Sequence, residues 1–334
     1  MNGLYHAGEA VHSGSGDRYG ITDSVVHFDV AADVNAHLCH FFLGEGSGLR
    51  AGTDKTGGTA DIFYHMPCII CVNHFQLVGV TILMKAVNVN KAVIGIENNK
   101  PDAIAHLQKL AVNYKGIEIM PLKVQYPQGG EKQLIDAVIR RQVKSGALPI
   151  SAGAVVQNVG TAYAVYEAVQ KNKPLFERVV TITGKAVANP SNFLVRMGTP
   201  ISCLIEAAGG LPENTGKIIG GGPMMGKALI SAEVPVCKGS SGVLLLTTEE
   251  SVRKPIRDCI RCAKCVGVCP MGLNPTLLMN ATEFQNWELA EKNYITDCIE
   301  CGSCSYTCPA NRPLLDQIRL GKGKVMGIIR SRKS

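Results

Sequence analysis

The sequence lacks any uninterrupted run of 18 or more apolar residues, the length that a membrane-spanning helix needs. The longest candidate, residues 66–84, is interrupted by Asn73, His74, Gln76 and Thr81. The first residues also lack the basic stretch followed by an apolar stretch that marks a secretory signal. We therefore expect no spanning helix and no export. In a reducing compartment, clustered cysteines bind metal more often than they form disulfides.

Charged residues are scarce as well. They make up 18% of the chain against 46% hydrophobic residues, a composition that can bury a sizeable core and excludes a wholly disordered chain. The net charge is only +7, which gives no nucleic-acid-binding signature. Seven basic residues and one acid, Asp316, lie in residues 309–334. We predict a basic helix or tail over residues 313–334, which docks an acidic protein or an anionic membrane, or else simply faces solvent.

The first 75 residues or so differ from the rest of the chain. They hold seven of the eight histidines, and Lys55 is their only lysine. These histidines show no ligand spacing, so we interpret residues 1–75 as an atypical, loosely ordered segment with one strand-like run at 24–30.

Hydrophobic periodicity changes at residue 76 to the alternation of an α/β protein. It predicts helices over 77–87, 101–114, 131–144 and 161–171, and strands over 91–97, 117–124 and 155–158. This alternation is typical of a doubly wound, largely parallel sheet, here over residues 76–175. Residues 176–248 have a different texture, with predicted strands over 178–184 and 242–247 and a helix over 200–208. We expect a small mixed α+β subdomain there.

Eight of the thirteen cysteines form an internal repeat in residues 249–312. The first copy is Cys-x-x-Cys-x-x-Cys-x-x-x-Cys-Pro from Cys259 to Pro270, and the second runs from Cys298 to Pro309 with a constant offset of 39 residues. Three closely spaced thiolates cap three irons of a [4Fe–4S] cubane, and the fourth cysteine, expected at the start of a departing helix, binds the other cluster. The predicted ligand sets are Cys259, Cys262, Cys265 and Cys308 for cluster 1, and Cys298, Cys301, Cys304 and Cys269 for cluster 2.

A zinc ribbon is the alternative, but it needs pairs of cysteines and no third cysteine at this spacing. Two [4Fe–4S] clusters would carry out one-electron transfer. Arg261 and Lys264 in the first loop, against Asp297 and Glu300 in the second, would set the two potentials apart. Cys203 and Cys237 are expected in or near the core, and Cys68 and Cys71 are expected to be buried free thiols.

The clusters need a source of electrons, such as a flavin or nicotinamide cofactor, and both of these carry phosphate. Glycine-containing turns before helices are candidate sites for such a phosphate. One such turn contains Gly129, Gly130, Glu131 and Lys132, and the other contains Asn158, Gly160 and Thr161. Such turns also simply begin helices. Residues 220–223 are expected to form a tight turn.

Several blocks resemble the RnfC/RsxC family, one of the subunit families of the Rnf/Rsx ion-translocating electron transport complex. They are residues 91–100 (KAVIGIENNK), 126–134 (YPQGGEKQL), 155–161 (VVQNVGT), 198–202 (GTPIS), 220–226 (GGGPMMG) and both cysteine motifs. The resemblance covers about residues 76–325. It implies a flavin domain like that of the NADH-oxidising subunit of respiratory complex I, then a β-grasp-like ligand-binding subdomain, then an α-helical two-cluster ferredoxin-like domain.

The resemblance also implies a role for the whole protein. It would be the oxidoreductase subunit of a translocase-type complex, peripheral on the cytoplasmic face of the plasma membrane and bound to the membrane subunits of an Rnf-type complex. Electrons would pass between NADH and a ferredoxin-like carrier through FMN and the two clusters, coupled by the partner subunits to ion translocation. No separate catalytic residue is assigned.

One departure from the family concerns the FMN and NADH pocket. The family places the loops Gly-Gly-Ala-Gly-Phe-Pro-Thr and Asn-Gly-Ala-Glu-Cys-Glu-Pro upstream of Gln76, and neither occurs in this sequence. The seven candidate residues at the two glycine turns are the remaining half of that pocket. We hypothesise that residues 1–75 are replaced or read in a shifted frame, and translating the coding DNA in the other two frames tests this.

Two other functions fit the same motifs. One is a soluble flavoprotein reductase resembling the cobalamin reductase of propanediol-using microcompartments. The other is a non-catalytic scaffold whose clusters are structural. Neighbouring partner genes distinguish the first from an Rnf-type subunit, and clusters that cannot be reduced would indicate the scaffold.

Overall fold

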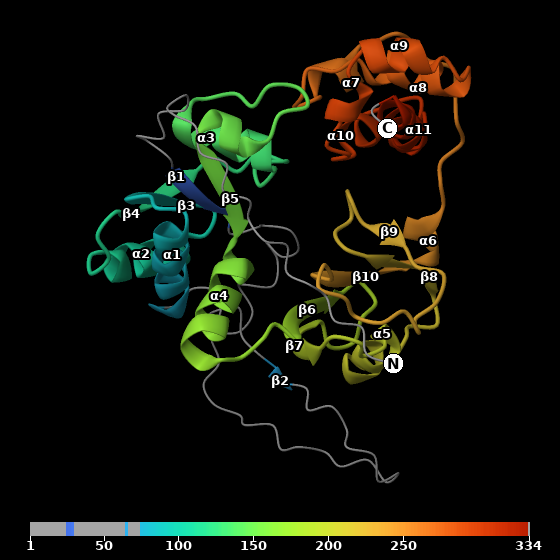
Figure 1. Ribbon diagram of the computed structural model, residues 1–334. Coiled ribbons are helices and arrows are strands. Elements are labelled where there is room, and N and C mark those ends of the chain that lie inside the picture. Colours follow the sequence, from blue (N-terminus) through green and yellow to red (C-terminus); the bar gives the residue numbers. More distant parts are fainter. Residues whose placement is uncertain (1–24, 30–63, 66–73, 333–334) are drawn as a thin grey trace, which may run out of the picture.

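The computed structural model describes residues 25–29, 64–65 and 74–332, which form two sheets and a helical region (Figure 1). Most of the histidine-rich segment, with Cys39, Cys68 and Cys71, lies outside the described residues, so the expectations for it stay predictions. Within the described residues, no helix has both the length and the apolar character that crossing a membrane requires.

The first sheet is parallel and has four strands in the order β4-β3-β1-β5. The strands are β1 (Val25–Asp29), β3 (Lys91–Glu97), β4 (Ile117–Leu122) and β5 (Ala154–Asn158). Five consecutive residues of β3 are buried, as expected for a strand covered on both faces. The predicted parallel α/β sheet is confirmed. One of its two inner strands, β1, comes from the segment that sequence analysis set apart as 1–75.

Helices cover both faces of this sheet. The helices are α1 (His74–Ala86), α2 (Pro101–Ala111), α3 (Glu131–Ile139) and α4 (Val159–Lys171). Ile94 and Ile96 of β3 pack with α1, α2 and α4, whereas Gly95 faces Leu134 of α3, because successive strand residues point to opposite faces. The predicted end of the third helix at 144 is wrong. Arg140 adopts a left-handed conformation (φ 57°) and ends α3 there.

Helices α1 and α4 approach each other closely at a glycine. A Cβ atom built on Gly79 would collide with the backbone carbonyl of Ala162. We expect Gly79→Ala to lower the free energy of unfolding by about 1–3 kcal/mol, the usual cost of overpacking, measured by urea unfolding. The matched control is Gly323→Ala, a helical glycine with open space around its Cβ position, which should leave stability unchanged or raise it by up to about 1 kcal/mol. Equal destabilisation by both would contradict the prediction.

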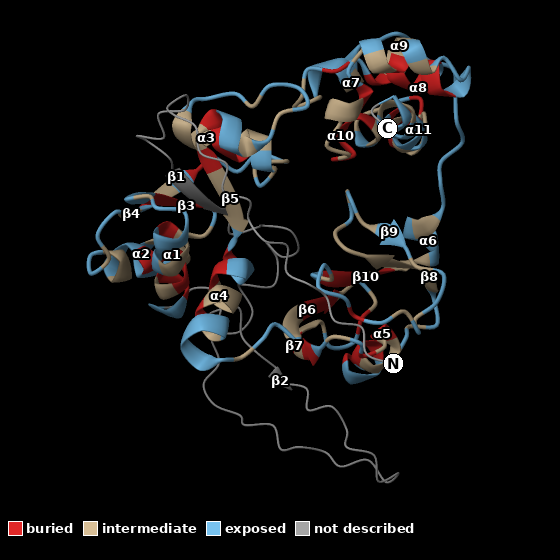
Figure 2. Cartoon of the chain, in the orientation of Figure 1, coloured by how far each residue is buried: buried red, intermediate tan, exposed pale blue. Residues whose placement is uncertain are grey.

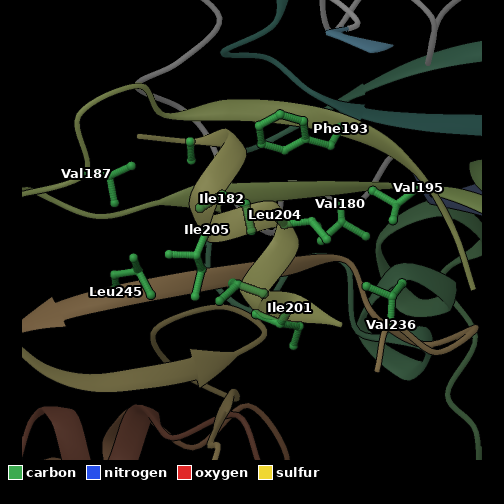
Figure 3. Packing of buried hydrophobic residues seen from close by; sticks show 12 residues of the cluster. Val180, Ile182, Val187, Phe193, Val195, Ile201, Leu204, Ile205, Val236 and Leu245 are labelled. Carbon is green, nitrogen blue, oxygen red and sulfur yellow. The ribbon is translucent and has the colours of Figure 1, made fainter. Parts of the chain in front are cut away.

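The second sheet is mixed, with six strands in the order β2-β7-β6-β10-β8-β9. Its strands are β2 (Tyr64–His65), β6 (Glu177–Thr183), β7 (Ser191–Arg196), β8 (Thr215–Gly220), β9 (Lys227–Ala228) and β10 (Gly242–Thr247). Helix α5 (Ile201–Ala207) packs on it, and Figure 3 shows Leu204 and Ile205 directed at Val180, Ile182 and Leu245. The mixed α+β prediction is confirmed, although the sequence did not predict β7 and β8. Cys203 is half-buried, but Cys237 is exposed and not in the core as expected.

The cysteine motifs lie in the helical region. Its helices are α7 (Lys264–Gly267), α8 (Pro275–Glu283), α9 (Trp287–Lys292), α10 (Ser303–Tyr306) and α11 (Leu314–Ser331), whereas α6 (Thr248–Ser251) packs against β8 and β10 of the second sheet. The core joins Leu278 of α8 to Ile318 and Val325 of α11. Neither Cys269 nor Cys308 begins a helix as expected, since α8 and α11 each begin six residues later.

The predicted basic helix at the end of the chain is α11, and acids of this region neutralise much of its charge. Arg319 and Lys322 both bind Glu300, at 3.0 and 3.1 Å. Arg332 binds Glu291 at 2.8 Å. Arg312, just before the helix, lies 3.7 Å from Glu283. The local excess of positive charge therefore serves largely to hold the helical region together.

Candidate functional site

Both cysteine loops turn through left-handed residues at matching positions. In the first loop these are Arg261 (φ 55°) and Ala263 (φ 58°), and in the second loop Glu300 (φ 59°) and Gly302 (φ 82°). Left-handed residues turn the backbone sharply, and strained ones cluster at sites that bind ligands. The two loops therefore share one local conformation as well as one spacing.

One cavity is enclosed by four cysteines and apolar side chains. Cys298, Cys301 and Cys304 of the second loop line it together with Cys269 of the first, around about 370 Å³ that includes space open to solvent. The other walls are Pro270, Met271, Leu273, Pro275, Leu278, Ile299, Gly302, Leu315 and Ile318. Cys301 and Cys304 are buried. This cavity therefore combines four thiols with a largely apolar lining.

The second cavity has the complementary set of cysteines. Cys259, Cys262 and Cys265 line it with Cys308 of the other motif, around about 740 Å³ that includes space open to solvent. Cys259 and Cys262 are exposed. Each cavity thus takes three cysteines from one motif and the fourth from the other, the same grouping as the predicted ligand sets.

The chemistry of each set suits an iron–sulfur cubane. Within residues 74–332, no three His, Cys, Asp or Glu side chains gather closely enough to hold a single metal ion. A cubane presents four separate irons, one to each thiolate, and so matches four thiols spread around a cavity. In cluster 2, backbone N–H groups of Leu273 and Glu300 donate to the Sγ atoms of Cys269 and Cys298, both at 3.4 Å. Such bonds stabilise thiolate charge. The residues present therefore fit two cubanes.

Burial raises the pKa of two thiols of the predicted cluster 2 set. It raises the pKa of Cys298, and it raises the pKa of Cys304 to about 11. Metal binding must therefore displace protons from these thiols.

The acids of the second loop are offset by cations from other elements. Asp297 lies 3.8 Å from the Nζ atom of Lys132, on α3. Lys322 Nζ also donates to the Cys298 carbonyl at 2.7 Å. Burial acts to raise the pKa of Glu300, but Lys322 and Arg319 outweigh it and lower that pKa. The expected contrast of an acidic second loop with a basic first loop is therefore reduced by pairing.

The two glycine turns lie at the starts of α3 and α4. Gly130 is the N-cap of α3, and Lys132 of its first turn is directed at Asp297 of the cluster region. At the start of α4, the Asn158 side chain accepts from the Gly160 N–H at 2.9 Å. Gly129 and Glu131 lie with the first turn, and Thr161 lies with the second. The Gly160 N–H is thus already bonded within the chain, and the other backbone N–H groups at the two helix starts are of the kind that bind phosphate.

Three contacts to the cluster 2 wall come from distant parts of the chain. The Tyr126 hydroxyl donates to the Cys301 carbonyl at 2.7 Å, and Gln133 Nε2 donates to Met271 Sδ at 2.9 Å. Arg319 of α11 donates to the Met225 carbonyl at 3.1 Å, in the segment between β8 and β9 that follows the predicted turn at 220–223. Segments of both sheet-containing domains thus contact the cluster 2 region. Sequence analysis placed Tyr126 in a family block but gave no sign of this contact.

Three family models match successive parts of the chain. The Nuo51 FMN-binding domain matches residues 71–167, the SLBB domain matches residues 179–228, and the 4Fe-4S dicluster domain matches residues 251–309. A crystal structure of NAD⁺-reducing [NiFe]-hydrogenase in the air-oxidized state has the same fold, with a TM-score of 0.52 and 15% identity over 91% of this chain and 60% of that one. The predicted succession of three architectures is confirmed.

Several curated relatives share the predicted family. The C-subunit of the Na⁺-translocating ferredoxin:NAD⁺ oxidoreductase complex of Acetobacterium woodii is 45% identical over 75% of this chain and 56% of its own length. Its counterpart in the proton-translocating complex of Clostridium ljungdahlii is 46% identical over 65% and 47%. The counterpart in the ion-translocating oxidoreductase complex of Rhodobacter capsulatus is 41% identical over 74% and 48%. The chain spans about half the length of these relatives. It belongs to the RnfC/RsxC family of ion-translocating ferredoxin:NAD⁺ oxidoreductase subunits.

Proposed function

We propose that this chain passes single electrons between NADH or a flavin and a ferredoxin-like carrier, as the electron-transfer subunit of an Rnf-type complex. The observation that carries the proposal is the pair of cavities, each lined by three cysteines of one motif and one of the other. A chain with one such set of four cysteines could hold one electron-carrying cluster. Two adjoining sets give electrons a path through the chain.

The ligands in this proposal are the predicted sets. Cys259, Cys262, Cys265 and Cys308 hold cluster 1, and Cys298, Cys301, Cys304 and Cys269 hold cluster 2. When bound, each cluster accepts and donates one electron at a time. The chain itself supplies the thiolates, the N–H groups that stabilise them and the apolar walls that keep water from cluster 2.

On the input side, we propose that the starts of α3 and α4 face the flavin phosphate. Supporting this are the match to the FMN-binding domain over residues 71–167 and the two helix N-termini. The glycine-rich loop of the family is absent from residues 1–75, so these two helix starts are the candidate pocket in this chain.

We also propose that the chain is peripheral, bound to membrane subunits on the cytoplasmic side, with ion translocation carried out by those partners. The support is the set of relatives that are named as subunits of ion-translocating complexes. Co-purification of this chain with membrane subunits encoded beside it tests this part.

The first test is cofactor content after anaerobic purification. We expect about eight irons and about eight sulfides per chain, since each [4Fe–4S] cluster has four of each, and we expect dithionite to reduce both clusters. Clusters that resist reduction would indicate the structural scaffold instead. Flavin content decides whether electrons from NADH enter through this chain. One FMN per chain, bleached by NADH, supports entry here, and the absence of FMN assigns entry to another subunit.

A further inference from the structure

The two cluster sites differ in their access to solvent. Of the described cysteines, the two that are buried, Cys301 and Cys304, both belong to cluster 2, whose wall is also held by Tyr126 of the first sheet's domain. Cys259 and Cys262 of cluster 1 are exposed. Because the rate of electron tunnelling falls steeply with distance, an external carrier exchanges electrons with the cluster it can approach most closely. That cluster is cluster 1.

The surface around cluster 1 is strongly basic. We call residues 252–268 the basic loop; every residue of its first part, 252–264, is exposed, and Figure 2 shows the chain that leaves α6 in pale blue. The loop carries one acid, Asp258. Its cations are Arg253, Lys254, Arg257, Arg261 and Lys264.

Four of these five cations are available to a partner, whereas Arg319 and Lys322 of α11 are paired with Glu300. Arg253 binds Asp316 at 2.6 Å. In the part of the chain that the structure describes, the side chains of the other four make no ion pair. The loop is nevertheless held in place beside Cys308. The Arg257 N–H donates to the Ala310 carbonyl at 2.9 Å, and Asn311 donates to the Pro255 carbonyl at 3.1 Å. The positive charges are therefore fixed next to cluster 1.

Exposed aliphatic side chains alternate with these charges. Ile256 and Ile260 are 59% and 70% exposed, and Val252 is 68% exposed. Protein interfaces combine an apolar centre with a charged rim, and transient redox partners use complementary charge to speed encounter. The basic loop has both features at the place where two thiols of cluster 1 reach the surface.

We propose that the basic loop is the docking site of an acidic protein that carries its own iron–sulfur centre, and that cluster 1 exchanges electrons with it. This inference rests on the proposed function, because it requires reducible clusters. Cluster 2 then lies on the flavin side, where Lys132 and Gln133 of α3 contact its wall. An anionic membrane would also attract cations, but residues 252–263 of the basic loop are irregular and α7 has only four residues, whereas soluble segments usually enter a bilayer surface as an amphipathic helix.

The test is electron transfer from the dithionite-reduced full chain to an acidic [2Fe–2S] ferredoxin, followed by stopped flow. The variant is Lys254→Glu with Arg257→Glu, neither of which is adjacent to a cysteine ligand. We expect its second-order rate at low ionic strength to fall about tenfold or more, because electrostatic steering raises on-rates by that factor. The difference should shrink at about 0.5 M salt, where screening is strong.

The matched control is Lys324→Glu with Arg330→Glu, an equal charge change at exposed positions of α11. We expect its rate to stay within about twofold of the wild type, since its charges lie away from the loop. Equal losses in both variants, or none in the first, would overturn the docking site. Binding to phosphatidylglycerol vesicles that only the loop variant loses, with an unchanged ferredoxin rate, would assign the loop to a membrane and overturn the proposal.

The outcome for the proposed function is read separately. Iron content and reduction by dithionite are measured first in the wild type and both variants. A wild type without reducible clusters would contradict the proposed function itself. Clusters that reduce normally, with no dependence of the ferredoxin rate on the loop charges, would contradict the docking site alone.

Discussion

Removing Cys259 and Cys308 together should leave one intact [4Fe–4S] cluster, although the two cysteines belong to different motifs. Both line the same cavity, so Cys259→Ala with Cys308→Ala removes two ligands from cluster 1 and none from cluster 2. We expect iron to fall from about eight to about four per chain, because one four-iron cluster is lost. The remaining cluster should keep its electron paramagnetic resonance spectrum and its midpoint potential.

A second double variant distinguishes this assignment from the alternative in which each motif holds its own cluster. Cys259→Ala with Cys269→Ala removes two cysteines of the same motif, which line different cavities. We expect it to leave no intact four-iron cluster, since each cluster loses one ligand. If each motif instead held its own cluster, the outcomes would be exchanged. The two variants remove equal numbers of thiols, so a general loss of stability would affect both alike.

The cysteines line the two cavities in the predicted grouping because chemistry constrains their spacing, and the ligand sets themselves stay predictions. Three thiolates on one short loop must face a common centre, and the fourth must come from elsewhere, so the repeat alone indicates two interleaved sets. The parallel sheet was equally accessible, since the buried run of β3 and the helical periodicity around it are local signals. The end of α3 was not, because a left-handed Arg140 has no signature as clear as glycine.

Contacts between distant segments left no trace in the sequence. Tyr126 donates to Cys301 across 175 residues, and nothing near either residue indicates the pair. Net charge was misleading for the same reason. The basic end of the chain suggested a docking tail, yet Arg319 and Lys322 are paired with Glu300, while four cations of the basic loop make no ion pair among the described residues. Only three-dimensional pairing decides which charges remain available.

The same pairing predicts a large effect at Glu300, which lies between two ligands of cluster 2. Glu300→Gln removes a negative charge and leaves Arg319 and Lys322 without their shared partner. Reduction adds negative charge to the cluster, so removing a nearby negative charge favours the reduced state and should raise the midpoint potential of cluster 2. At an effective dielectric constant of about 20, a charge about 8 Å away contributes about 2 kcal/mol. Glu300 is about a third exposed, so solvent screening reduces this to about 1 kcal/mol, or about 40 mV.

The shift is best measured in a chain that also carries Cys259→Ala and Cys308→Ala. This chain retains only cluster 2, so the signal of cluster 1 does not overlap with that of cluster 2. The control is Glu291→Gln on α9, a helix that lines neither cavity. This change breaks a comparable ion pair, the one between Glu291 and Arg332. We expect the control to leave the potential unchanged. A Glu300→Gln potential equal to that of the control would mean that Glu300 only fastens α11 to the loop. A shift confined to Glu300→Gln would show that the ion pairs of α11 set the driving force for electron transfer through cluster 2.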